Sequence, residues 1–163
     1  MKKQITCYAR YCLLFGAMLT LLFGCDKVKK PDGLPELYPL SIKLTQEKDK
    51  PLVDASVRLM TTDKNATTRW SISGSTNAQG VAALKTHGEY SGAPTGTYKI
   101  VVTKEEIVYD KSNPPQIIGR FHLVESKYAN IVTTPLTIEV KPDTKSIEFD
   151  LGKVVHEKME TPP

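Results

Sequence analysis

The segment Gly92-Ala-Pro-Thr-Gly-Thr-Tyr-Lys-Ile-Val-Val-Thr-Lys104 decides how the chain is expected to fold. Its first five residues contain two glycines and a proline, which suit the backbone angles of a turn. The second half places Tyr98, Ile100 and Val102 in alternation with Lys99 and Thr103. A period of two puts the apolar side chains on one face of a strand. The segment therefore predicts a turn followed by a strand that is buried on one side.

The same alternation occurs in other parts of the chain. It is clear at 40–45, 55–59, 70–73, 136–140 and 147–151, and less regular at 81–86. Asp, Asn, Gly and Pro separate these segments, and 142–145 is expected to join the last two strands as a hairpin. No segment keeps a helical period over ten residues. Seven short strands in about 115 residues predict an all-β fold, a seven-stranded Greek-key β-sandwich.

The N-terminal segment has the features of a targeting signal. Lys2, Lys3 and Arg10 precede an uncharged apolar run from Cys12 to Phe23. Twelve helical residues would cover only ~18 Å, which is short of a hydrocarbon core of ~30 Å. The run therefore fits the apolar region of a signal peptide better than a membrane-spanning helix.

The run ends in Leu22-Phe23-Gly24-Cys25, which resembles the bacterial lipobox. In that motif the cysteine thiol receives diacylglycerol, so Cys25 is the predicted lipid-anchor residue. The alternative is an ordinary signal peptide in which this cysteine is incidental. The lipobox predicts a protein of the bacterial cell envelope, anchored to the inner or outer membrane and facing the periplasm or the exterior.

These features divide the chain into four predicted parts. Residues 1–24 are the lipoprotein signal peptide, and 25–39 are a lipidated tether with three prolines and a glycine. Residues 40–155 are the β-sandwich, and 156–163 are a C-terminal tail. Fourteen extended residues of tether reach at most ~50 Å, which would hold a small domain clear of lipid headgroups.

The charge of the chain is mostly a property of its first residues. The formal net charge is +4, but three of the 22 basic residues and none of the 18 acids lie in 1–24. The mature chain would therefore carry 19 basic residues against 18 acids, scattered along the sequence. Nucleic-acid binding, which needs a clustered basic face, is not expected.

Three segments, one of which is 92–104, resemble the carboxypeptidase-regulatory-like and transthyretin-like domains. Residues 50–57 (KPLVDASV) are similar to the family element GKPLAGAxV, and 75–81 (STNAQGV) to its turn TDxxGxF. Residues 92–104 are similar to its strand GxPxGxYxVxVxK. Asn77 and Gly80 are expected to permit the tight turn because both tolerate positive φ. The resemblance covers about residues 40–152 and is closest to small bacterial lipoproteins that carry this domain.

The resemblance implies a transthyretin-like sandwich whose role is contact with protein, peptide or glycan, and not catalysis. One transthyretin-like branch hydrolyses 5-hydroxyisourate and needs a C-terminal Tyr-Arg-Gly-Ser, whereas this chain ends Met159-Glu-Thr-Pro-Pro163. A hydrolase is kept as the alternative. It would need a cleft that gathers histidine and arginine side chains, from His87, His122, Arg58, Arg69 and Arg120.

Candidate chemistry elsewhere in the sequence is sparse. His87-Gly-Glu89 is the histidine motif closest to metal-ligand spacing, but a metal site wants three or four ligands. Glu105 and Glu106 are adjacent, so a strand would direct them to opposite faces and not across a cleft. No metal, cofactor or catalytic residue is therefore predicted.

The segment 104–134 breaks the rhythm of strands and is the predicted contact region. It is long for a loop in a compact domain and could include a short strand near 119–124. Long loops on a rigid scaffold often carry binding sites. A second hypothesis is a structural or adhesive component of an envelope assembly that pairs through an exposed edge strand. An aromatic platform for sugar or peptide is a third, built from Tyr38, Tyr90, Tyr109, Tyr128 and Trp70.

Overall fold

The computed structural model describes residues 30–62 and 70–159. The chain divides into two units, Met1–Leu34 and Pro35–Pro163. In the described end of the first unit, the Leu34 N–H donates to the Pro31 carbonyl at 3.2 Å. The strands found in the described residues all lie in the second unit, and the following description concerns it alone.

Strands make up the regular structure of the second unit, together with one 3-10 helix, η1 (Ser126–Ala129). The first sheet has four strands, in which β1 pairs with β12 on one edge and with β2 and β5 on the other. Its strands are β1 (Ser41–Gln46), β2 (Lys50–Pro51), β5 (Val81–Ala83) and β12 (Ser146–Asp150).

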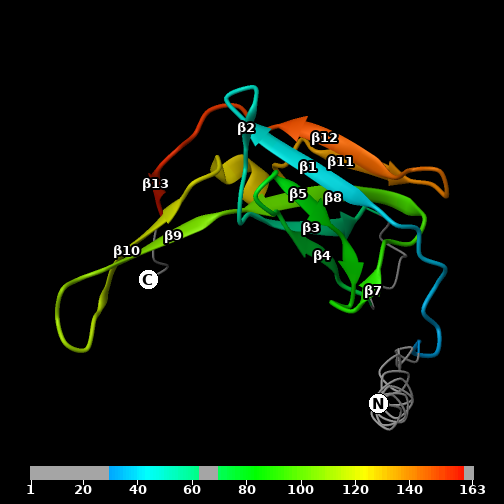
Figure 1. The fold of residues 1–163 in the computed structure, drawn as a ribbon, viewed down its shortest axis with the longest axis horizontal. Coiled ribbons are helices and arrows are strands. Elements are labelled where there is room, and N and C mark those ends of the chain that lie inside the picture. The colour runs from blue at the N-terminus through cyan, green and yellow to red at the C-terminus, as the bar shows by residue number, and fades with distance from the viewer. Residues whose placement is uncertain (1–29, 63–69, 160–163) are drawn as a thin grey trace, which may run out of the picture. The chain divides into compact units, whose positions relative to one another are not determined.

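The second sheet has six strands in the order β11-β8-β3-β4-β6-β7. They are β3 (Ser56–Thr61), β4 (Ile72–Ser75), β6 (Lys85–Thr86), β7 (Tyr90–Ser91), β8 (Gly96–Thr103) and β11 (Thr137–Val140). A third sheet, in the order β13-β10-β9, contains β9 (Glu105–Tyr109), β10 (Ile117–His122) and β13 (Glu157–Lys158). Figure 1 shows β9 and β10 as a long hairpin that extends away from the strands of the first two sheets.

The predicted alternation builds the core. Ile42 and Leu44 of β1 are buried while Lys43 between them is exposed, and Tyr98, Ile100 and Val102 of β8 are buried in the same manner. The buried residues of the first and second sheets form one hydrophobic cluster. The chain is therefore an all-β protein with a sandwich core, which confirms the predicted class.

The number of strands differs from the predicted seven, since thirteen are present in the described residues. The segment 81–86 is two strands, because β5 pairs with β1 in the first sheet and β6 pairs with β4 in the second. The chain changes sheets at Leu84, which is buried and whose N–H donates to the Leu40 carbonyl at 3.0 Å. This crossing explains the irregular period of the segment.

The predicted hairpin through 142–145 is wrong. β11 pairs antiparallel with β8, whereas β12 pairs parallel with β1, so the two strands belong to different sheets. The turn itself is closed, because the Thr144 N–H donates to the Lys141 carbonyl at 3.0 Å. Turn residues specify that the chain reverses direction, but they do not specify with which strand the next segment pairs.

The turn at 75–81 was predicted to have positive φ at Asn77 and Gly80, and the structure has it at Gly80 alone of these two. Gly80 has a φ of +73°, and a Cβ on it would lie 2.5 Å from the Leu44 carbonyl oxygen, so only glycine fits. Asn77 acts through its side chain and not through positive φ. Its Oδ1 accepts the N–H groups of Gln79 and Val81, each at 3.0 Å, which is an Asx turn.

Tyr98 lies on the buried face of its strand, as predicted, at the margin of the core. The residue is 8% exposed, and its hydroxyl donates to the Pro94 carbonyl at 3.1 Å. Burial raises the pKa of this phenol above its ordinary value. The hydrogen bond from the hydroxyl to Pro94 connects the strand to the turn that precedes it.

Buried threonines satisfy the backbone where strands leave the sheets. The Thr76 Oγ1 accepts the buried Ala55 N–H at 2.8 Å, and the Thr86 hydroxyl donates to the Gly92 carbonyl at 2.7 Å. A buried backbone group without a partner costs about 1–3 kcal/mol. In the connections between strands, these hydroxyls therefore provide the backbone hydrogen-bond partners that a neighbouring strand provides within a sheet.

We predict that Thr76→Val lowers the free energy of unfolding by about 1–3 kcal/mol, because the methyl group leaves the Ala55 N–H buried and unpaired. Urea denaturation of the purified protein measures the loss. The matched control is Thr137→Val, since Thr137 is exposed on β11 and should change stability by less than about 0.5 kcal/mol. Equal effects of the two changes would contradict the role given to Thr76.

Candidate functional site

The segment predicted as the contact region, 104–134, begins with a hairpin of β9 and β10 and continues through η1. Only Lys104 separates β8 from β9, and the Leu123 N–H donates to the Lys104 carbonyl at 2.8 Å, which closes the hairpin at its base. We call residues 105–122 the arm. The predicted strand near 119–124 exists as β10, and its partner β9 is a strand that the sequence pattern does not predict.

Asp110 closes the tip of the arm. Its Oδ1 accepts the N–H groups of Gln116 at 2.8 Å and Ser112 at 3.1 Å. The Asp110 N–H in turn donates to the Gln116 carbonyl at 2.9 Å. The hydrogen bonds from Gln116 and Ser112 stabilise the carboxylate and lower the pKa of Asp110 below its ordinary value.

One face of the arm is covered by the C-terminal segment. β13 pairs with β10, and the imidazole of His156 stacks on the Phe121 ring with centroids 4.1 Å apart. The His156 Nε2 lies 2.8 Å from the Glu106 Oε2 on the neighbouring strand. Gly119 makes room for this cluster, because a Cβ there would lie 2.8 Å from the Phe121 ring.

The opposite face of the arm carries exposed apolar side chains, together with charged ones such as Arg120, which lies opposite Ile107. Tyr109 lies opposite Ile117, and Ile107 lies two residues along the same strand, so the three side chains share a face. Ile118, at the register shift between Ile117 and Gly119, is the neighbouring exposed isoleucine of the hairpin. These four side chains, which we call the arm patch, are 39% to 61% exposed. Single exposed hydrophobic residues are ordinary, but a group of four on one projecting hairpin is typical of an interaction site.

The residues of the alternative hydrolase lie on separate elements. His87 follows β6 and contacts the Trp70 ring edge-on, with centroids 5.8 Å apart. Arg58 lies on β3, whereas Arg120 and His122 both lie on β10 in the arm. Arg69 is outside the described residues. The structure therefore brings together Arg120 and His122 from this set, on one strand.

The candidate carboxylates are separated as expected. Glu106 faces His156, and Glu105 lies opposite His122 on the other face of the arm. The carboxylate of Asp110 accepts hydrogen bonds from backbone N–H groups at the tip of the arm. In residues 30–62 and 70–159, no three His, Cys, Asp or Glu side chains gather closely enough to hold a metal ion.

The five aromatic residues of the suggested platform do not form one surface. Tyr128 is buried in the core, and Tyr109 belongs to the arm patch. Tyr38 forms a β-bridge with Ala93, Tyr90 lies on β7, and Trp70 precedes β4 beside His87. The distribution favours packing roles over a sugar-binding platform.

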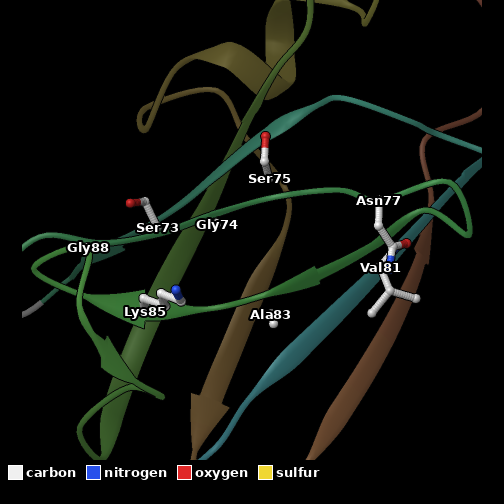
Figure 2. Close-up of a pocket in the computed structure, with 8 residues that line it drawn as sticks. All are labelled: Ser73, Gly74, Ser75, Asn77, Val81, Ala83, Lys85 and Gly88. Carbon is white, nitrogen blue, oxygen red and sulfur yellow. The ribbon is translucent and has the colours of Figure 1, made fainter. Parts of the chain in front are cut away.

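A shallow pocket of about 450 Å³ lies between β4 and β5. Figure 2 shows its charged group, Lys85 on β6, and the hydroxyls of Ser73 and Ser75 on β4, which do not point to a common centre. The Asn77 amide oxygen in its wall is occupied by two backbone N–H groups. Because the lining has no carboxylate or imidazole, this pocket is a weaker candidate than the arm.

The predicted lipid-anchor residue, Cys25, lies outside the described residues. Within 30–62 and 70–159, no helix has the length and apolar character needed to cross a bilayer.

Comparison with known proteins finds distant structural likenesses alone. No protein-family model matches the chain, and no curated protein matches it. BcpA, the major pilin subunit of Bacillus cereus, is 12% identical, with 77% of this chain and 31% of that chain covered and a TM-score of 0.38. The 9R-lipoxygenase from Cyanothece PCC8801 is 15% identical, with 79% and 18% covered and a TM-score of 0.31.

The chain spans less than a third of the length of either protein. A likeness at this level carries no argument about activity or partners. The resemblance to carboxypeptidase-regulatory-like lipoproteins therefore stays a prediction.

We predict that the tip of the arm opens in acid. The pKa of Asp110 is lowered in the folded arm, so its carboxylate stabilises the tip above the ordinary pKa of ~3.9. That stabilisation is lost as the pH falls below this value through the lowered pKa. Hydrogen exchange should show that the Gln116 amide loses protection over this range.

The matched variants are Asp110→Ala and Asp143→Ala. The first should remove protection of the Gln116 amide already at neutral pH, because it removes the acceptor. The second changes an exposed carboxylate in another turn and should leave this amide protected. Unchanged protection in Asp110→Ala would show that the tip does not depend on the carboxylate.

Proposed function

We propose that the chain is a lipid-anchored, extracytoplasmic and non-catalytic β-module that contacts a partner protein through the arm. The observation that carries this proposal is the arm patch on a hairpin that extends away from the sandwich (Figure 1). Apolar side chains exposed on one projecting element gain free energy when a partner covers them.

The chemistry of the patch favours protein over glycan. Sugar sites use aromatic faces with several polar groups, whereas the patch has Tyr109 as its one aromatic side chain and three isoleucines. A hairpin also offers backbone groups along its edge, which extended protein segments bind by adding a strand. A second protein surface is therefore the partner that fits the arm.

The sequence supports the anchor. The lipobox-like Leu22–Cys25 follows a charged start and a short apolar run, and a proline-containing tether follows it. Each buried methylene of an attached acyl chain contributes about 0.8 kcal/mol, and two or more chains give stable attachment. The tether would then carry the sandwich and its arm outside the membrane surface.

We predict that Cys25→Ser releases the protein from membranes. The serine hydroxyl cannot receive the lipid, so the variant should move from the membrane pellet to the soluble fraction or stay as an unprocessed precursor. Fractionation of cells with a high-salt wash, followed by mass measurement, distinguishes these forms. Cys12→Ser is the matched control, since it lies in the predicted signal peptide and should leave anchoring intact.

We predict that a photo-crosslinking residue at Ile118 captures a protein in intact cells. Ile118 is 61% exposed in the arm patch, whereas Val132, which is 80% exposed, lies outside the arm and provides the control. Position 118 should give discrete adducts that position 132 does not give. Equal adduct patterns at the two positions, or none at Ile118, would reject the arm as the contact site.

A further inference from the structure

The free edge of β9 is the feature that carries a further inference. In the described part of the chain, β9 pairs with β10 on one side and with no strand on the other. The Lys104 carbonyl and the Asp110 N–H are both bonded toward β10. Since backbone groups alternate in direction along a strand, Glu105, Ile107 and Tyr109 direct their N–H and C=O groups to the open edge.

This edge has two acids, Glu105 and Glu106, but it lacks other usual protections against strand addition. β9 contains no proline or lysine, and the register shift of the hairpin lies in β10. The same edge of β8 is covered by β3, which reaches Thr103 through the pair with Ser56. The edge is therefore covered up to Thr103 and open along β9.

We propose that a second copy of this chain occupies this edge, with the two β9 strands antiparallel and Ile107 opposite Ile107 of the second copy. This inference rests on the proposed function and names the partner of the arm. In a symmetric antiparallel pair, one residue lies opposite its own copy. Three registers pair at least three residues of β9, and they are centred on Glu106, Ile107 or Val108.

Charge selects among these registers. Centring on Glu106 places Glu106 opposite its own copy, and centring on Val108 places Glu106 opposite Asp110. Like charges in directly opposed positions are destabilising. Centring on Ile107 places Glu106 opposite Val108 and Lys104 opposite Asp110, so no acids meet and two opposite-charge pairs form at the ends.

The Ile107-centred register also pairs all five residues of β9. Glu105, Ile107 and Tyr109 would each exchange backbone hydrogen bonds with the second copy, because these residues face the open edge. The axis between the copies runs perpendicular to the sheet, so the two arm patches would lie on the same face. The result is a six-stranded sheet in which the two Ile107 side chains are adjacent and Glu105 of each copy lies opposite Tyr109 of the other.

The size of the contact suits anchored chains. One short strand pair buries less than the ~1,200 Å² of typical stable interfaces, so free chains would associate weakly. Attachment to one membrane raises the effective concentration of a second copy. The experiment is therefore made with the full-length protein in cells.

Single cysteines at positions 106, 107 and 108 test the pairing. In the proposed register the two copies of residue 107 have Cα atoms about 5.5 Å apart, which suits a disulfide, whereas the copies of residue 106 or 108 are too far apart. After mild oxidation, Ile107→Cys should give at least tenfold more covalent dimer than Glu106→Cys or Val108→Cys. The unsubstituted chain, oxidised in the same way, shows how much covalent dimer the native cysteines form.

A second variant tests the edge without a cysteine. Ile107→Pro removes an N–H that faces away from β10, so the hairpin is retained while strand addition is blocked. It should lower at least tenfold the dimer captured by amine cross-linking of anchored protein, while Gln116 amide protection stays unchanged.

The outcomes separate this inference from the proposed function. A dimer that forms best at position 106 or 108, or at none of the three, overturns the proposed register or the self-pairing. If Ile118 still captures a different protein, self-pairing fails while the arm remains a contact site. If neither the cysteines nor Ile118 gives an adduct, both proposals fail.

Discussion

The antiparallel ladder between β3 and β8 is the interaction on which the rest of the structure depends. It runs from Ser56 opposite Thr103 to Thr61 opposite Tyr98, and it places Val57 opposite Val102 on the buried face. A slip of one residue would turn this face to solvent, so the packed core fixes the register. The same ladder fixes where the arm begins, because β8 continues into β9 after the last pair.

The connections between the sheets impose a second constraint, since backbone groups leave their ladders inside the protein. At Thr134 the hydroxyl donates to the Ile100 carbonyl at 2.8 Å, and this threonine is buried. Thr76 and Thr86 act in the same manner at other connections. Threonine suits these positions because it combines a hydroxyl with a compact β-branched side chain that packs like valine. The sandwich therefore closes without disulfides in its described part.

The period of two predicted strands wherever one face packs on the core, as in β1, β8 and β11. It missed β9 because neither face of the arm enters the core, so apolar and charged residues there follow no burial period. It predicted β11 as the partner of β12, whereas β12 pairs with β1. The partner of a strand depends on which strand edge is open in the folded sheet, and the period does not show this. The pairing of Glu106 with His156 was not predictable, since 50 residues separate them and stacking on Phe121 positions the imidazole.

The C-terminal strand determines which part of the arm can meet a partner. A two-stranded hairpin is marginally stable in water, and β13 makes the arm a three-stranded sheet. By pairing with β10, β13 also covers one edge, while His156 covers the face that carries Phe121. What stays open is the β9 edge and the face that carries the arm patch. An added strand at that edge would lie beside Ile107 and Tyr109, so backbone pairing and apolar contact would occur together on one side of the arm.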